Sequence, residues 1–164
     1  MSNSNTLLQV ENISAWYGRA QAIFDLSLEV KKGEVVALMG ANGAGKSTTL
    51  KAIMNMLERK SGQVIFNGQN ITKAPPYKIA RAGLGFVPED RRVFTELTVK
   101  ENLQTGRQPA RHWSDGEPVY YWTEEALYKL FPNLGKMPDR PGGKMSGGEQ
   151  QMLSVARSLM GNPL

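Results

Sequence analysis

The stretch GANGAGKST, residues 40–48, constrains what this chain can fold into more than any other segment. It matches the pattern G-x-x-x-x-G-K-[ST], and it lies between the apolar run EVVALM and a segment whose apolar residues have helical spacing. Such a loop turns its backbone amides toward phosphate oxygens, and the helix that follows adds the positive end of its dipole. The sequence therefore predicts a strand, a phosphate-binding loop and a helix in succession.

The residues of this loop have separate expected roles. Glycine lets the backbone wrap closely around a ligand, Lys46 is expected to reach the β- and γ-phosphates, and the Ser47 hydroxyl is expected to bind Mg²⁺. The alternative is a glycine-rich turn that binds nothing, but such a turn does not require Lys-Ser in this register. The predicted nucleotide-binding residues of the loop are Gly40, Asn42, Gly43, Ala44, Gly45, Lys46, Ser47 and Thr48.

A second glycine-bearing helix start lies in KMSGGEQQML, residues 144–153. Ser146 and Glu149 have the spacing of a capping box, which predicts a helix from about residue 149 to about residue 160. A cap alone does not require Gly147 and Gly148. Glycine there indicates close backbone approach to a group outside the segment, although the helix start can serve as a simple cap at the same time.

Strand and helix patterns alternate through the first half, so the predicted fold class is α/β. After Pro88 the pattern changes to short helices, and residues 107–122 read as a polar surface loop. Two short apolar runs, residues 34–39 and 84–87, are of the kind that is buried in a parallel sheet. The remaining expected strands are 7–13, 22–30 and 62–68, and the remaining expected helices are 50–57, 75–83, 98–103 and 123–131.

Composition narrows the class of protein further. The 164 residues, 40% hydrophobic and 21% charged, suit one soluble globular domain. The absence of cysteine excludes disulfides and thiolate metal sites. The net charge of +5 is spread over short pairs rather than one basic block, so nucleic acid is not an expected partner. The first residues do not read as a signal peptide, and no apolar run approaches a membrane span, which predicts a cytoplasmic location.

GANGAGKST upstream of MSGGEQQML resembles the ATP-binding subunits of ABC transporters, and the resemblance covers essentially the whole chain. The segments VPE, RRVF and ELTVKENL are most similar to those of the ATP-binding subunits of branched-chain amino acid importers, with the urea-importer type as a near relative. The resemblance implies a P-loop NTPase: an ABC-type core sheet with a helical subdomain. It assigns residues 1–88 to the nucleotide-binding core, residues 89–160 to the helical subdomain with the signature motif, and residues 161–164 to the start of the Walker B strand.

The resemblance also implies roles for residues outside the phosphate loop. Ser146, Gly147 and Gly148 belong to the signature motif, which in the family faces the γ-phosphate held by the Walker A loop of the opposite subunit. The family's usual leucine and glutamine at this motif are Met145 and Glu149 here.

Two further positions match family sites. Tyr17 matches the aromatic residue that stacks on adenine, with Trp16 as its rival and an ordinary core or turn tyrosine as the alternative. Glu89 stands where the family has a glutamine that touches Mg²⁺ or the attacking water; the alternative is a solvated turn acid. The implied catalytic residues are Lys46, Glu89 and Ser146, and the implied metal ligands are Ser47 and Glu89.

The expected function is that of a subunit that binds and hydrolyses ATP to energise an importer. Its expected partners are a homologous or identical subunit in a head-to-tail dimer and transmembrane permease subunits. A solute-binding protein would act indirectly, and the subunit would lie on the inner face of the cell membrane. In the family the Walker B strand and its catalytic glutamate come next, so we expect an incomplete sheet, weak hydrolysis and marginal stability. The alternatives are a nucleotide-binding remnant without hydrolysis, a urea-type subunit, or a soluble ABC-type ATPase, which should carry a coiled-coil insertion or second cassette.

Overall fold

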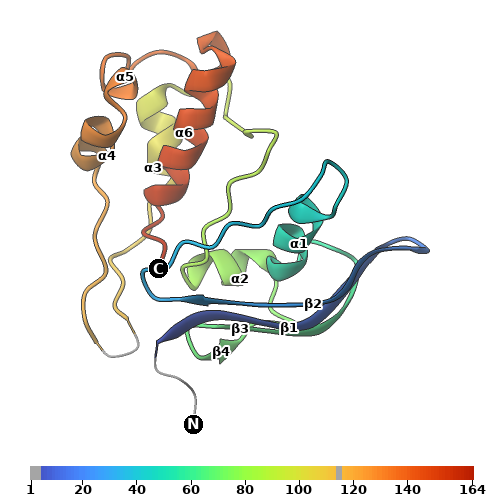
Figure 1. The fold of residues 1–164 in the computed structure, drawn as a ribbon. Coiled ribbons are helices and arrows are strands. Elements are labelled where there is room, and N and C mark those ends of the chain that lie inside the picture. Colours follow the sequence, from blue (N-terminus) through green and yellow to red (C-terminus); the bar gives the residue numbers. More distant parts are fainter. Residues whose placement is uncertain (1–4, 114–115) are drawn as a thin grey trace. The chain divides into compact units, whose positions relative to one another are not determined.

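The structure is a computed structural model that describes residues 5–113 and 116–164 (Figure 1). It forms two compact units, one ending at Ala82 and the other spanning Gly83–Leu164. Residues 83–88 belong to the second unit, in which the Leu164 amide donates to the Gly83 carbonyl at 2.9 Å. Within the described residues, no helix is long and apolar enough to cross a membrane.

The first unit contains one four-stranded antiparallel sheet with the strand order β2-β1-β3-β4. Strands β1 (Thr6–Tyr17) and β2 (Ala20–Lys31) form a hairpin, and β3 (Arg59–Phe66) pairs with the other edge of β1 and with the short β4 (Gln69–Asn70). The pairing register is irregular between Glu11 and Ser14 of β1. Gly62 lies opposite this irregularity with φ +89°, and a Cβ there would be 2.5 Å from the Asn12 carbonyl oxygen, so only glycine fits.

Two helices of the first unit lie on one side of this sheet (Figure 1): α1 (Lys46–Ile53) and α2 (Pro76–Arg81). Helix α1 buries Ala52 and Ile53, and α2 buries Ile79. The sheet contributes alternating buried residues such as Val64 and Phe66. The core of the unit therefore lies where the apolar side of the sheet meets the helices.

Two of the predicted strands are wrong. Residues 34–39 and 84–87 have no strand pairing, and Val35 and Met39 are 95% and 87% exposed. Apolar patterning predicts that a segment can be buried, but a strand also needs a hydrogen-bonded neighbour. Among the described residues no parallel strand lies beside either run, so their backbones stay irregular.

The second unit is helical. Helices α3 (Val99–Gly106) and α6 (Gly147–Leu159) lie side by side (Figure 1), accompanied by α4 (Glu124–Leu130), α5 (Pro132–Gly135) and a 3₁₀ turn, η1 (Gly142–Lys144). A Cβ at Gly106 would lie 2.2 Å from the Arg157 carbonyl oxygen, which shows how closely the two long helices approach. The core of this unit comprises Val99, Leu103, Leu127, Leu134, Met145, Leu153, Ala156 and Met160.

The expected surface loop at residues 107–122 includes residues 114 and 115, which lie outside the described residues. Its described parts are tied to the C-terminal turn by the buried side chain of Asn162. The Asn162 amide donates to the Gln108 carbonyl and accepts from the Trp122 amide, each at 2.8 Å. Arg111 adds a bond from Nε to the Asn162 carbonyl at 2.7 Å, so this polar segment is anchored along its length.

Candidate functional site

Two glycines shape the loop that precedes α1. Gly43 and Gly45 have φ +85° and +90°, which side chains other than glycine rarely adopt. A Cβ at Gly45 would lie 2.6 Å from Cδ1 of Ile23, whereas a Cβ at Gly43 would meet nothing within 4 Å. The two positions therefore share a backbone requirement, but only Gly45 also has a packing requirement.

This difference gives a testable prediction for the stability of the first unit. We expect Gly43→Ala to lower the free energy of unfolding by about 1 kcal/mol, because alanine is strained at positive φ. Gly45→Ala is expected to cost about 2–4 kcal/mol, because overpacking against Ile23 adds to the same strain. Hydrogen exchange of the β1 and β3 amides measures both losses. Equal losses in the two variants would contradict the packing argument.

Lys46, the first residue of α1, folds back over the loop. Its Nζ atom donates to the carbonyl oxygens of Gly40 and Ala41, each at 2.8 Å. Both acceptors are neutral, so neither neutralises the ammonium charge. The loop backbone from Gly40 to Ala44 is exposed, and Ser47 and Thr48 are half-buried in the first turn of the helix. The structure thus holds a positive charge across an open, glycine-containing turn.

The N-terminus of α1 also lacks the side-chain caps that begin three other helices. Its N-cap residue is Gly45, with no side-chain hydrogen bond and no acidic residue in the first turn. By contrast, α3, α4 and α6 begin at Thr98, Thr123 and Ser146, each of which accepts a hydrogen bond from a first-turn amide. The start of α1 therefore has neither a side-chain cap nor an acidic residue, and the positive end of the helix dipole there favours an anion.

Tyr17 and Trp16 differ in how much of each ring remains available. The Arg59 guanidinium lies over the Trp16 ring, with its Cζ atom 4.6 Å from the ring centroid. Tyr17, at the end of β1, is 51% exposed. An exposed tyrosine face is free to stack on a flat base, so the geometry favours Tyr17 over its rival for the predicted adenine contact.

The predicted capping box at the start of α6 is present. The Ser146 amide donates to Glu149 Oε2 at 2.8 Å, and the Glu149 amide donates to Ser146 Oγ at 3.3 Å. The hydrogen bonds from the backbone and side chain of Ser146, with a smaller effect of nearby Arg140, keep the pKa of Glu149 below its ordinary value. The helix begins at Gly147, two residues before the predicted start, because glycines do not prevent a well-capped first turn from forming.

The two glycines at the start of α6 have different surroundings. A Cβ at Gly147 would lie 3.0 Å from Nη1 of Arg91, whereas a Cβ at Gly148 would meet nothing within 4 Å. Packing within the described chain therefore gives a reason for glycine at 147 and none at 148. Ser146 and Gly148 are both exposed, so this helix start is accessible from outside the unit.

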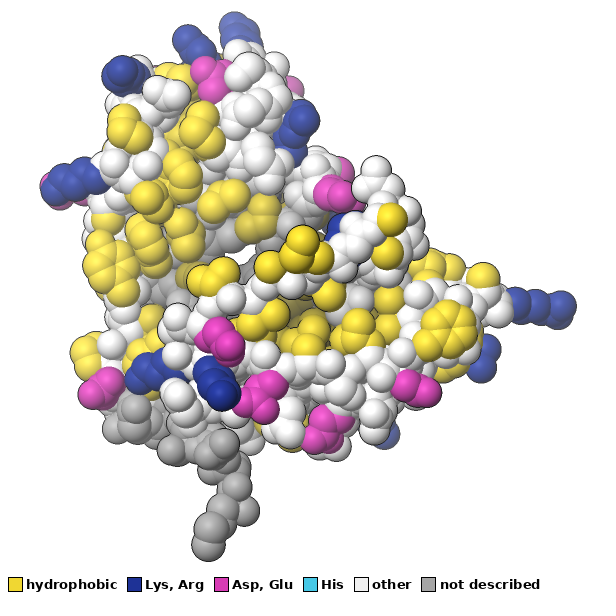
Figure 2. Space-filling view, in the orientation of Figure 1, with side chains coloured by type: hydrophobic (Ala, Val, Ile, Leu, Met, Phe, Trp, Pro, Cys, Tyr) yellow, Lys and Arg dark blue, Asp and Glu magenta, His cyan; other side chains and the backbone are white. Residues whose placement is uncertain are grey.

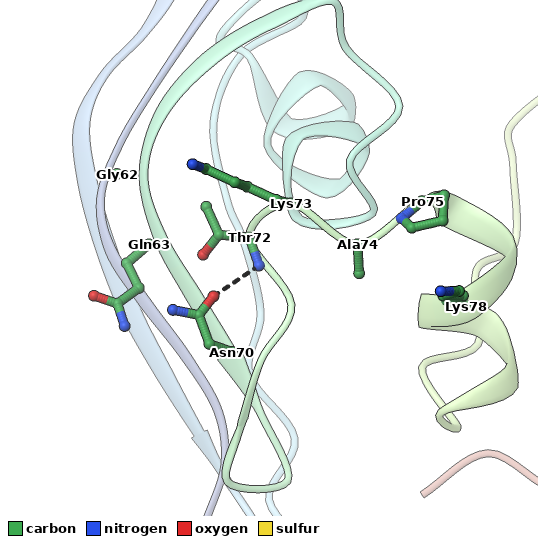
Figure 3. Close-up of a pocket in the computed structure, with 8 residues that line it drawn as sticks. All are labelled: Gly62, Gln63, Asn70, Thr72, Lys73, Ala74, Pro75 and Lys78. Atoms are coloured by element: carbon green, nitrogen blue, oxygen red, sulfur yellow. Dashed lines mark hydrogen bonds between the residues drawn. The ribbon is translucent and has the colours of Figure 1, made fainter.

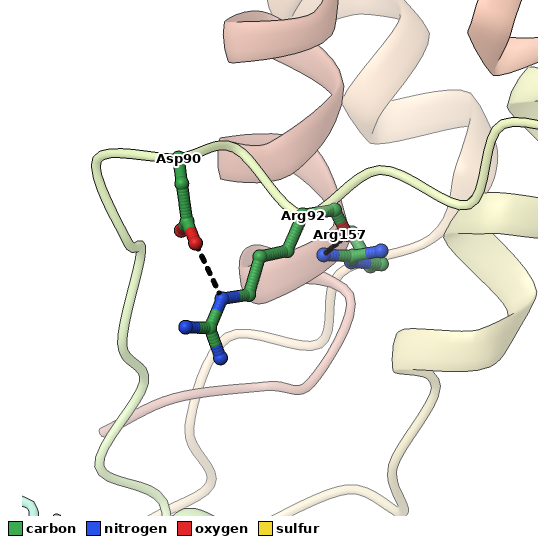
Figure 4. Close-up of polar contacts among 3 residues, drawn as sticks. All are labelled: Asp90, Arg92 and Arg157. Atoms are coloured by element: carbon green, nitrogen blue, oxygen red, sulfur yellow. Dashed lines mark hydrogen bonds and ion pairs between the residues drawn. The ribbon is translucent and has the colours of Figure 1, made fainter.

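Glu89 lies in an exposed loop of the second unit that runs from residue 89 to residue 94, hereafter loop 89–94. In this loop Arg92 Nε pairs with Asp90 Oδ2 at 2.8 Å (Figure 4). Arg91 and Arg92 have φ +61° and +48°, which is unusual for two consecutive residues that are not glycine. Of the predicted site residues, Glu89 and the signature residues belong to this unit, and the phosphate loop and Tyr17 to the first.

Sequence reasoning missed Asn102, which fixes the segment after this loop. The side chain is fully buried, and its Nδ2 atom donates to the carbonyls of Phe94, Leu97 and Thr98 at 3.0, 3.0 and 2.9 Å. Its Oδ1 atom accepts from the Phe94 amide at 2.9 Å. A signal was available: Asn102 follows Val99 by three residues on a helix face that is otherwise apolar, where a polar side chain implies a buried partner.

Asn102→Ala is expected to destabilise the second unit by about 2–4 kcal/mol, because each lost bond contributes about 1 kcal/mol and the Phe94 groups lose their partner. Gln104→Ala is the matched control, since Gln104 lies on the same helix with an exposed side chain. Urea unfolding followed through the α3 and α6 amides measures both. A loss in Asn102→Ala no greater than the control's would show that water replaces these bonds at little cost.

A separate groove of about 670 Å³ lies between β3, β4 and the start of α2 (Figure 3). In it the Asn70 Oδ1 atom accepts from the Thr72 amide at 3.0 Å. No predicted site residue lines it, and its lining has no aromatic side chain for a base, so the groove does not compete with the phosphate loop. The lining residues are Gly62, Gln63, Asn70, Thr72, Lys73, Ala74, Pro75 and Lys78.

Known proteins with similar sequences indicate the family of this chain. The sequence profile of a family described as "ABC transporter" matches residues 23–164. The chain is 42% identical over 157 residues to the high-affinity branched-chain amino acid transport ATP-binding protein BraG of Pseudomonas aeruginosa, covering 96% of this chain and 65% of BraG. It is 38% identical over 154 residues to the probable branched-chain amino acid transport ATP-binding protein LivF of Archaeoglobus fulgidus, covering 94% and 63%. The chain thus spans just under two thirds of either relative.

A solved structure shares the fold. MJ1267, an ATP-binding cassette of an ABC transporter, superimposes with a TM-score of 0.72 at 31% identity, covering 96% of this chain and 66% of that one. The predicted α/β P-loop fold class is therefore confirmed, although the two short strands named above are not formed.

Proposed function

The chain belongs to the ABC transporter family, and on that premise we propose that the protein it represents binds and hydrolyses ATP to energise an importer of branched-chain amino acids. The family resemblance drawn from the two glycine-bearing motifs is confirmed. The names of BraG and LivF support the transported class. The predicted site residues keep their roles as part of this proposal.

One observation carries the proposal: α1 begins without a side-chain cap, directly behind an open loop that Lys46 spans. The positive end of the helix dipole and an ammonium group together suit a polyphosphate, because both favour negative charge at the same place. The Gly45 carbonyl is occupied by Thr49, whose amide and hydroxyl both donate to it, so it does not repel the ligand. Tyr17 completes the proposed nucleotide site by stacking on adenine.

The side chains assigned to Mg²⁺ in this proposal carry oxygen atoms, which this ion prefers as ligands. Among the described residues no three acidic or histidine side chains gather into a metal site of their own. Mg²⁺ commonly uses one or two protein ligands and takes its other oxygens from phosphates and water. Ser47 would supply one oxygen and Glu89 a second, and the ion would neutralise charge on the phosphates. Glu89 would further orient the attacking water by accepting its hydrogen bond.

The glycine at position 148 supports the proposed role of a second subunit. Nothing within 4 Å of its Cβ position explains the glycine, and the adjacent Ser146 is exposed. Space of this kind suits close approach of a ligand held elsewhere. In the proposed head-to-tail dimer, Ser146, Gly147 and Gly148 of one subunit would face the γ-phosphate bound by the phosphate loop of a homologous or identical partner.

Loop 89–94 is the proposed contact with the transmembrane permease subunits. It is exposed, and Phe94 presents 52% of its surface. Hydrophobic side chains lie on the face of the molecule that Figure 2 shows, and contiguous exposed apolar side chains mark sites of protein interaction. The protein would then lie on the cytoplasmic face of the membrane, and a solute-binding protein would act on it only through the permease.

The test uses the complete protein reconstituted in vesicles with its permease subunits and solute-binding protein. We expect Mg²⁺-dependent ATP hydrolysis that rises when leucine, isoleucine or valine is supplied, together with uptake of that solute. Stimulation by urea instead would identify the urea-type alternative. Retention of MgATP without turnover would leave a nucleotide-binding remnant, and no magnesium-dependent binding would overturn the proposal.

A further inference from the structure

Within the second unit, the first and last turns of helix α6 both contact loop 89–94. In the first turn, Gly147 lies against the Arg91 guanidinium. In the last turn, the Arg157 Nη2 atom donates to the Arg92 carbonyl oxygen at 2.7 Å, and Figure 4 shows this side chain reaching the loop. The Arg157 Cζ atom also lies 5.1 Å from the centroid of the Phe94 ring.

The loop needs such contacts because its backbone is strained. Arg91 and Arg92 both have φ in the left-handed region, which costs about 1–2 kcal/mol for each residue that is not glycine. The Asp90–Arg92 ion pair is local and exposed, so it contributes little to holding this conformation. The bond from Arg157 comes from a different element, and it fixes the carbonyl between the strained residues and Phe94.

The chemistry of arginine suits this position. A guanidinium can stack on an aromatic ring while its N–H groups donate in the plane, whereas a lysine ammonium can do only one of these well. Arg157 is partly buried, and desolvation lowers its pKa below the ordinary value. In the part of the chain that the structure describes, its Nη1 atom is buried without a hydrogen-bond partner. The side chain is therefore held mainly through Nη2 and the Phe94 ring.

We propose that Arg157 is a positioning residue that joins loop 89–94 to α6, so that the helix carrying Ser146 and the proposed permease contact move as one body. This inference rests on the proposed function, because it assumes that loop 89–94 contacts the permease subunits. Arg157 need not touch nucleotide in this role. It converts a displacement of α6 into a displacement of the loop.

The experiment uses the complete protein in vesicles with its permease subunits, and it compares Arg157→Gln and Arg157→Lys with Lys129→Gln, a control at an exposed position of α4. In Arg157→Gln we expect amide exchange at residues 91–93 to rise about tenfold while α3 amides are unaffected. Solute transported per ATP hydrolysed should fall about tenfold, with the KM for MgATP within about twofold of wild type. Arg157→Lys should be intermediate, and Lys129→Gln should match wild type.

The proposal fails if exchange at residues 91–93 is unchanged, or if transport and hydrolysis fall together in proportion. It also fails if exchange rises across the whole second unit and lysine behaves like glutamine, because Arg157 would then be a general stabilising residue. If Arg157→Gln does not fold, the same measurements on Arg157→Lys test the proposal. Wild-type protein without ATP turnover would overturn the proposed function, and the exchange data would separately show whether Arg157 holds the loop.

Discussion

Replacing Lys46 with alanine in the complete protein is expected to lower the turnover of MgATP by about 100-fold or more, because a preorganised charge at the phosphates is lost. In the structure the ammonium group is already fixed across the loop by two neutral carbonyls. Little reorganisation of the ammonium group is needed when phosphate arrives. The contribution of Lys46 to turnover should therefore be close to that of a preformed hydrogen-bond donor. ATP hydrolysis and retention of labelled MgATP measure the effect.

Lys51→Ala is the matched control, because Lys51 lies on the same helix, carries the same charge and is exposed near its other end. We expect its turnover and its nucleotide retention to remain close to wild type. The fold should survive both substitutions, since neither removes buried apolar surface. If both lysine variants lost activity equally, net charge rather than the position of Lys46 would be responsible.

The second large effect is expected at Gly148. Because no atom of the described residues lies within 4 Å of its Cβ position, Gly148→Ala should fold normally and even favour the helix slightly. In the proposed dimer the added methyl group would enter the space that the partner's nucleotide would occupy. Overpacking of about 1–3 kcal/mol would lower turnover by about tenfold to a hundredfold. Thermal unfolding and ATP hydrolysis on the same samples separate the two effects, and Gln151→Ala, on the exposed face of α6, is the control.

A mixing experiment distinguishes action on the partner from action within one subunit. A heterodimer of Lys46→Ala and Gly148→Ala subunits contains one site in which both groups are intact, if the signature residues serve the opposite phosphate loop. Equal mixing of the two inactive proteins should then restore up to about a quarter of the wild-type sites. If Gly148 served its own loop, every site would stay defective and mixing would restore nothing.

The helix caps of the second unit could be predicted because their signals are local. The capping boxes at Thr98 and Ser146 depend on residues three positions apart, and both are formed. The phosphate loop likewise follows from the spacing of Gly40, Gly45 and Lys46, and the structure gives it an open turn and an uncapped helix. Helix starts and tight turns are decided by hydrogen bonds within a few residues, which a sequence displays directly.

Other features depended on distant segments. Residues 34–39 and 84–87 have the apolar character of buried strands, but a strand exists only where another segment pairs with it. The roles of Asn102 and Arg157 likewise depend on hydrogen bonds to carbonyl groups of loop residues that the fold brings near them. The sequence by itself determined which helices carry side-chain caps and where a glycine-bearing turn precedes a helix, because those depend on neighbours along the chain. Only tertiary structure decided which strands pair and which side chains fix loop 89–94, because those depend on neighbours in space.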